Sequence, residues 1–169
     1  AGIPVMIDFG GHIPPLSLER LLMEELRPGD IFTHAFGHVP GRIPIVDERG
    51  KVRDYVREAQ ERGIIFDVGH GGGSFLFRQA IPAIKSGFLP NTISTDLHTG
   101  SMNAGMKSQI NVMSKFINMG MTLTDVIEAS TWTPAQVLQR EELGHLSEGA
   151  VADIAVINLL EGDFGYVDS

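Results

Sequence analysis

The chain has 169 residues, of which 43% are hydrophobic and 20% charged, as is usual for one globular domain. The formal net charge of −8 and the lack of any Lys/Arg cluster argue against a nucleic-acid surface. The absence of cysteine excludes disulfides, zinc–thiolate sites and thiol nucleophiles. With no membrane-length apolar run and no recognisable signal peptide, we expect a cytoplasmic protein.

Apolar strand-like runs alternate with helix-like runs along the chain. In chain order the patterns predict a strand at 4–10, a helix at 16–26, a strand at 31–36, a helix at 52–62, a strand at 64–68, a helix at 75–86, a strand at 92–96 and a helix at 109–118. Ser17 is the expected N-cap of the first helix. Two short helices are expected near 122–124 and after Thr133, which precedes a proline, and a last strand is expected at 151–159.

This alternation favours an α/β fold with a parallel sheet, because helical crossovers join strands that run in the same direction. The strand runs are apolar throughout, which fits a sheet that is covered on its outer face. A doubly wound sheet and a (β/α) barrel both fit this pattern. Periodicity alone does not separate these two architectures.

Potential metal ligands stand at or just after the ends of the four main strands: Asp8, His34, His70 and Asp96. The carboxyl ends of parallel strands open on one face, so we expect these side chains to converge. Carboxylate oxygens and imidazole nitrogens bind Zn²⁺, which lowers the pKa of its water to around 7. A lone Asp after a strand is more often a turn residue, and a lone His a structural one, but four in register favour a shared site.

The Gly-rich run at 69–73, which contains His70, leads into the helix predicted at 75–86. Its backbone N–H groups could form a nest for an anion, either a phosphate or a substrate carboxylate. The run lacks the Lys of a phosphate-binding P-loop and does not match the dinucleotide fingerprint. A tight turn that lets the helix pack on the sheet is the alternative interpretation.

Six motifs follow one another at residues 28–34, 66–75, 93–98, 101–103, 131–135 and 144–153. In this order they resemble the carboxyl-terminal half of the amidohydrolase superfamily, most closely its branch of deacetylases and dihydroorotases. Each motif alone is weak, but the ordered set is specific and covers nearly the whole chain. The resemblance implies that residues 1–148 form strands five to eight of a (β/α)₈ TIM-type barrel. Residues 149–169 would then lead into a flanking β-sandwich.

The resemblance also implies roles for individual residues. His34 would be the metal ligand on strand six, and Asp96 would be both a ligand on strand eight and the general base that takes a proton from water. Asp8 stands where the family usually has a histidine ligand on strand five. The substrate-binding residues would be His70, Gly71, Gly72 and His98.

The sequence departs from the family pattern by what it does not contain. It has no His-x-His of strand one and no lysine at a strand end that could be the carboxylated lysine of strand four. We therefore expect a divalent metal, Zn²⁺ in the first place, as one or two ions whose remaining ligands lie outside this chain. The chain would be a piece of a longer polypeptide, or else a half-barrel that pairs with a second copy into a homo-oligomer.

The first functional hypothesis is a metal-dependent hydrolase that cleaves an amide-type C–N bond in an N-acyl amino acid or a cyclic amide. Its partner would be a small-molecule substrate that bears a carboxylate, with no nucleic acid or membrane involved. The second hypothesis is a non-catalytic fragment or degenerate relative that binds a ligand or partner on the same scaffold. A third is a phosphate-binding barrel enzyme without metal, suggested by the Gly-rich run.

Overall fold

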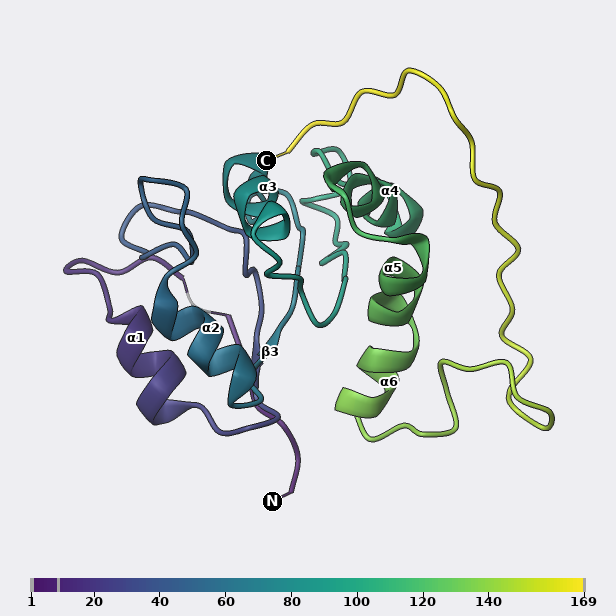
Figure 1. Ribbon diagram of the computed structural model, residues 1–169, viewed down its shortest axis with the longest axis horizontal. Coiled ribbons are helices and arrows are strands. Elements are labelled where there is room, and N and C mark those ends of the chain that lie inside the picture. Colours follow the sequence, from purple (N-terminus) through teal and green to yellow (C-terminus); the bar gives the residue numbers. More distant parts are fainter. Residues whose placement is uncertain (1, 9, 169) are drawn as a thin grey trace.

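The computed structural model describes residues 2–8 and 10–168 and contains a small parallel sheet beside a group of helices (Figure 1). The sheet consists of β1 (Met6–Ile7), β2 (Ile31–Phe32) and β3 (Ile65–Phe66), in that spatial order. Both pairs are parallel, with Met6 opposite Ile31 and Ile31 opposite Ile65. The prediction of a parallel α/β sheet is confirmed, although each strand is shorter than its apolar run.

A fourth parallel segment extends the sheet beyond β3. Thr92 forms a parallel bridge with Asp67, and the Val68 N–H donates to the Thr92 carbonyl at 3.0 Å. Two residues further along, the His70 N–H donates to the Ser94 carbonyl at 3.2 Å. The strand predicted at 92–96 is therefore present as a bridge that continues in hydrogen bonds. All four carboxyl ends lie along one edge of the sheet.

The helices follow the predicted order with shifted ends. The first is a short turn, α1 (Leu18–Arg20), that continues as a π-helix, η1 (Leu21–Glu25), and Ser17 Oγ accepts from the Arg20 N–H at 3.1 Å as the predicted N-cap. The others are α2 (Asp54–Glu61), α3 (Phe77–Lys85), α4 (Gln109–Met119), α5 (Leu123–Ser130) and α6 (Trp132–Val137). Helix α6 begins at Trp132, before the expected start after Thr133, and its N-cap position is Thr131.

Aromatic side chains join the sheet to the helices in one hydrophobic core. Phe66 of β3 meets Phe88 edge-on at 5.2 Å between ring centroids. Phe36, which follows β2, contacts Phe75 and, at 5.9 Å, Phe116 of α4. These rings have no exposed surface. The strand ends that carry the polar residues therefore stand on a rigid apolar base.

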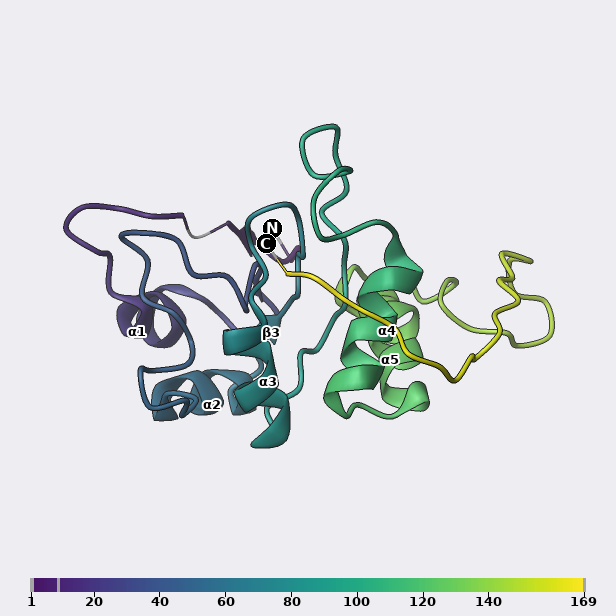
Figure 2. The same ribbon diagram turned by 90° about the horizontal axis from the view of Figure 1, so that it is seen from above.

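The C-terminal segment leaves α6 and runs around the α4–α6 side before it returns to α3 (Figures 1 and 2). Residues 151–165 are exposed, and within the described part of the chain residues 151–159 pair with no strand. The strand predicted at 151–159 is therefore wrong for this structure. A strand needs a neighbouring edge to satisfy its N–H and C=O groups, and no edge lies beside this segment.

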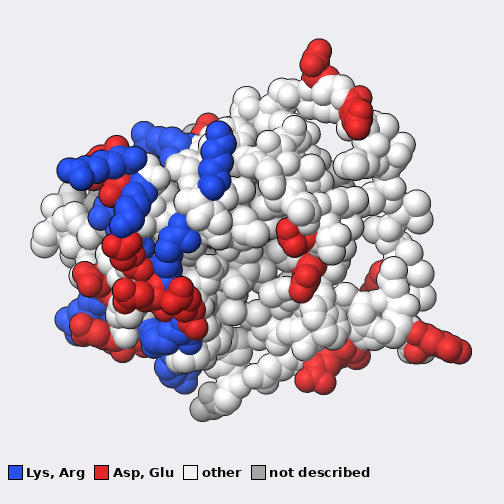
Figure 3. Space-filling view, viewed as in Figure 1, with Lys and Arg blue, Asp and Glu red and all other residues white. Residues whose placement is uncertain are grey.

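Charged side chains are distributed unevenly over the face seen in Figure 3. Basic and acidic groups are interleaved over α1 and α2, where Arg20 pairs with Glu25 at 2.9 Å and Lys51 with Asp54 at 2.7 Å. The part of this face over α4–α6 shows acidic groups and no basic ones. Among the described residues, no helix is both long and apolar enough to cross a membrane.

Candidate active site at the carboxyl edge of the sheet

His34 lies just after β2 with its ring largely buried, at 13% side-chain exposure. Its Nδ1 is 2.6 Å from the Gly69 carbonyl, and because a carbonyl only accepts, Nδ1 must carry the proton. The other nitrogen, Nε2, faces Asp8, and in the neutral ring it is the nitrogen that carries the lone pair. This is the tautomer that a metal-ligating histidine adopts when its second nitrogen is fixed by a carbonyl.

Asp8, just after β1, faces His34 across a short gap. Its Oδ1 is 3.6 Å from His34 Nε2, which is too long for a hydrogen bond. Two ligands held at ~2.1 Å from one ion with tetrahedral geometry stand ~3.4 Å apart, so the observed separation fits two corners of one coordination shell. Asp8 is 73% exposed, which leaves room for an ion and further ligands. These two residues fit a divalent metal as part of its donor set.

Asp96 follows the fourth segment of the sheet and is exposed. Its carbonyl accepts from Ser101 Oγ at 3.0 Å, and Ser101 itself is completely buried. A Cβ built on Gly71 would stand 2.6 Å from Asp96 Oδ2, so the carboxylate lies directly against this glycine. Asp96 is therefore open to solvent on one side and held against the Gly-rich loop on the other.

Both His34 and Asp96 have left-handed backbone conformations, with φ of 55° and 49°. Such conformations cost a non-glycine residue roughly 1–2 kcal/mol and are concentrated at functional sites. The His34 carbonyl is held by Arg42 Nη2 at 2.8 Å and the Gly37 N–H at 2.9 Å. Ser101 does the same for Asp96. The surrounding structure thus stabilises the backbone turn that directs each side chain.

The segment from Gly69 to Gly71 lies between these two side chains. A Cβ on Gly69 would come within 2.7 Å of His34 Nδ1, just as one on Gly71 would meet Asp96. The N–H groups of residues 69, 70 and 71 donate to Ser94 Oγ, the Ser94 carbonyl and the Thr95 carbonyl. These donors are already satisfied within the chain, so the predicted anion nest is not formed by this part of the loop. Gly72, half-buried, packs against Ser101.

His70 is placed differently from the expectation. It has no exposed surface and stacks on Phe75 at 4.4 Å between ring centroids. Its Nδ1 lies 2.9 Å from the Gly71 carbonyl and its Nε2 lies 2.8 Å from Lys115 Nζ, while burial lowers its pKa to about 4. A buried imidazole with both nitrogens engaged does not fit direct contact with a substrate. His98, by contrast, is exposed, and its Nδ1 accepts from the Gly100 N–H.

Asp67 is the centre of a hydrogen-bond network next to the site. The sequence analysis did not identify this residue. This carboxylate, 4% exposed, accepts from three hydroxyls at 2.6–2.7 Å, those of Thr33, Thr92 and Ser94. Ser94 Oγ in turn accepts from the Gly69 N–H at 3.0 Å. The recurrence of Thr, Asp and Ser at neighbouring strand ends was the signal available in the sequence.

Replacing Asp67 by Ala is expected to destabilise the protein by about 3 kcal/mol or more, because two buried threonine hydroxyls and the half-buried Ser94 hydroxyl would lose a charged acceptor. The measurement is the free energy of unfolding from urea denaturation. Asp163→Ala, which removes an exposed carboxylate from the C-terminal segment, is the control and should change the free energy by less than about 0.5 kcal/mol. Equal stability of the two variants would contradict this role for Asp67.

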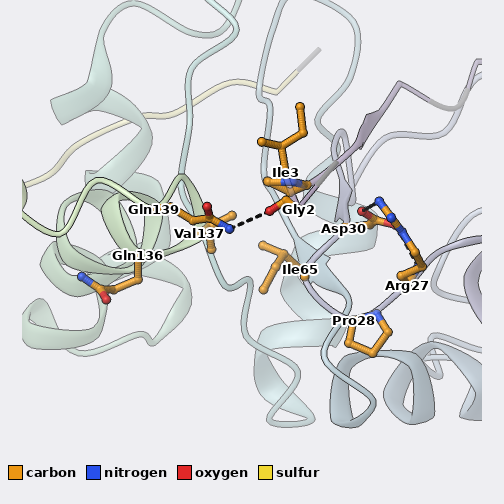
Figure 4. Close-up of a pocket in the computed structure, with 11 residues that line it drawn as sticks. Gly2, Ile3, Arg27, Pro28, Asp30, Ile65, Gln136, Val137 and Gln139 are labelled. Atoms are coloured by element: carbon orange, nitrogen blue, oxygen red, sulfur yellow. Dashed lines mark hydrogen bonds and ion pairs between the residues drawn. The ribbon is translucent and has the colours of Figure 1, made fainter.

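A cavity of about 490 Å³ lies at the opposite edge of the sheet (Figure 4). It is lined by residues that precede β1 and β2 and by residues of α6, including Arg27, Asp30 and Gln136. Arg27 pairs with Asp30 at 3.0 Å, and Asp30 also accepts from the Val5 N–H, which ties the start of β1 to β2. The Arg27 side chain holds the pKa of Asp30 well below its usual range. This cavity lies at the amino ends of the strands, away from the edge that carries His34 and Asp96.

The described residues do not complete a metal centre. Within residues 2–8 and 10–168, no three His, Asp or Glu side chains are grouped closely enough to hold an ion. The structure brings Asp8 to His34 and both His34 and Asp96 to the loop at 69–71. A metal ion held by Asp8 and His34 would therefore need further ligands.

Comparison with known proteins gives the family. The model of the amidohydrolase family matches residues 77–167, which is more than half of the chain. The chain belongs to the amidohydrolase family. It is 38% identical, over 99% of its length, to a deacetylase of Brucella anthropi, and it spans 40% of that relative.

Two solved structures resemble this member of the amidohydrolase family. One is an adenine deaminase, with a TM-score of 0.79 and 30% identity over 88% of this chain and 40% of that chain. The other is a dihydroorotase, with a TM-score of 0.71 and 40% identity over 80% of this chain and 36% of that one. This amidohydrolase chain thus spans about two fifths of the length of the proteins it resembles.

Proposed function

We propose that this amidohydrolase chain contributes half of the active site of a metal-dependent hydrolase that cleaves an amide-type C–N bond. The observation that carries the proposal is the placement of His34, whose Nδ1 donates to the Gly69 carbonyl at 2.6 Å while its Nε2 faces Asp8 Oδ1 at 3.6 Å. The exposed Asp96 carboxylate stands on the far side of the same loop. Relatives named deacetylase, dihydroorotase and adenine deaminase support hydrolase or deaminase chemistry.

The chain would supply strands five to eight of a (β/α)₈ barrel from residues 1–148, with 149–169 leading into a flanking β-sandwich. Two observations support this division. The chain spans about two fifths of its relatives, and the outer edge of β1 is exposed at Val5 and Met6. A parallel strand with an exposed apolar edge fits a sheet that continues into further strands. The remaining metal ligands would come from those strands.

In the proposed reaction each residue has a separate task. His34 and Asp8 would hold a divalent ion, Zn²⁺ in the first place, which when bound lowers the pKa of a water molecule toward neutrality. Asp96 would accept the proton of the attacking water and deliver it to the leaving nitrogen, so that the C–N bond breaks as an amine departs. The exposed His98, two residues after Asp96, and the half-buried Gly72, which follows Gly71, would contact a substrate that bears a carboxylate.

The test is the metal content and activity of the full-length protein. His34→Ala is expected to remove at least one equivalent of bound metal and to lower turnover of N-acyl amino acids and cyclic amides by more than about 100-fold. His38→Ala is the matched control, because His38 is an exposed histidine four residues further along the same segment. Unchanged metal content in the His34 variant, together with activity that survives chelation, would contradict the proposal.

A second candidate function is binding without catalysis. It is favoured by the absence of three grouped ligands among the described residues and by the carboxylate of Asp8 at a position where the family has histidine. Retention of a bound acyl amino acid without any turnover in the metal-loaded protein would support this alternative. A phosphate-binding function without metal has less support, since the N–H groups of residues 69–71 donate hydrogen bonds to Ser94 and Thr95.

A further inference from the structure

Lys115 of α4 is buried at 1% exposure, and the proposed chemistry does not use it. Its Nζ contacts three acceptors, which are His70 Nε2 at 2.8 Å, the Gly105 carbonyl at 3.0 Å and the Val167 carbonyl at 2.8 Å. An ammonium group has three N–H donors, so this set uses all of them. Burial lowers the pKa of Lys115 to about 8, so the ammonium form is still the main one at neutral pH. A buried cation with matched acceptors indicates a specific structural task.

The donor set of Lys115 fixes the state of His70. Because Nζ donates, His70 Nε2 must accept, and the single ring proton is then on Nδ1, where it donates to the Gly71 carbonyl at 2.9 Å. Stacking on Phe75 fixes the ring plane. The imidazole is held on both nitrogens and on one face, so it has one orientation in the core.

The orientation of His70 affects the candidate site because its neighbours in the chain, Gly69 and Gly71, contact His34 and Asp96. Gly71, whose carbonyl His70 holds, lies against the Asp96 carboxylate, and the Gly69 carbonyl accepts from His34 Nδ1. Both glycines are left-handed, with φ of 47° and 53°, and neither places a side chain between the loop and the functional group that it contacts. A shift of the His70 ring would therefore move both contacts at once.

We infer that Lys115 and His70 form a buried positioning pair that sets the placement of Asp96 and His34 through the loop at 69–71. The inference rests on the proposed function, since it names the part of the core that holds the proposed base and metal ligand in place. Neither residue touches the substrate. Their effect is on the geometry of groups that do, and displacements of about 1 Å at such groups can cost on the order of 100-fold in rate.

The test compares steady-state kinetics of variants of the full-length protein. Lys115→Met keeps the length of the side chain and removes its donors, and it is expected to lower kcat by about 10- to 100-fold with KM changed by less than about threefold. Lys107→Met is the matched control, because Lys107 is an exposed lysine eight residues earlier, and its kcat should stay within about twofold. His70→Gln retains an acceptor for Lys115 and should keep more of the wild-type kcat than His70→Leu.

The outcomes separate this inference from the proposed function. A wild-type kcat in Lys115→Met, in a protein where Asp96→Asn abolishes turnover, would overturn the positioning role and leave the hydrolase intact. Full activity in Asp96→Asn would instead remove the proposed base. If Lys115→Met does not fold, the two His70 variants decide the matter: equal kcat in His70→Gln and His70→Leu would overturn the inference, and a higher kcat in His70→Gln would support it.

Discussion

Substituting Asp96 by Asn in the full-length protein is expected to lower kcat by about 100- to 10,000-fold, the range associated with loss of a general base. An amide cannot accept the proton of the attacking water, although it keeps the size of the carboxylate. Asp96 is exposed and its backbone is held by Ser101 Oγ, so the variant should unfold at nearly the same urea concentration as the wild type. Turnover and urea denaturation measured on one preparation check both statements.

Asp153→Asn provides the control for this substitution. Asp153 is also an exposed carboxylate, but it lies in the C-terminal segment. It should retain wild-type kcat, which would show that loss of one surface charge has no general effect on turnover. Substantial turnover by Asp96→Asn would exclude this residue as the general base and would mean that another group accepts the proton.

Gly71→Ala is expected to produce the second large effect. The added Cβ would come to 2.6 Å from Asp96 Oδ2 at a φ of 53°, so the flexible carboxylate must move away. We expect kcat to fall by about 10- to 100-fold from displacement of the proposed base, Asp96. The left-handed conformation should also cost roughly 1–2 kcal/mol in the free energy of unfolding. Kinetics and urea denaturation measure the two effects separately.

Gly73→Ala is a matched control in the same loop. No atom lies within 4 Å of a Cβ at Gly73, and its backbone is not left-handed. Its activity should therefore stay within about twofold of wild type, and its stability should be equal or slightly higher because alanine restricts the unfolded chain. Equal losses in the two glycine variants would mean that flexibility of the whole loop matters, rather than the contact between Gly71 and Asp96.

Local patterns predicted those features that depend on neighbouring residues. Ser17 caps the first helix, and the apolar run at 31–36 contains the parallel strand Ile31–Phe32, because capping and periodicity act over a few residues. The same patterns failed for residues 151–159, which have the composition of a strand but no neighbouring strand in this structure. Strand formation is decided by a partner, and composition does not supply one.

Parts of the candidate site could not be predicted from the sequence, because their contacts come from residues far apart in the chain. Lys115 looked like an ordinary helical lysine, although its position between the buried Val112 and Phe116 on one helix face was a hint that it would be buried. Asp67 appeared as part of a motif without a role, because its three hydroxyl donors come from the two segments of the sheet on either side of it. His70 was expected at the surface of the site and lies in the core instead.

The hydrogen bonds around the loop at 69–71 join residues that are far apart in the chain. His34 and Gly69 are 35 positions apart, and His70 and Lys115 are 45 apart. Contacts of such separation form late in folding, because the entropy of closing long loops must first be overcome. Local helices such as α4 can form in advance without creating any of this geometry. Recovery of enzymatic activity during refolding should therefore follow the slowest structural phase, which makes activity a reporter of the completed tertiary structure.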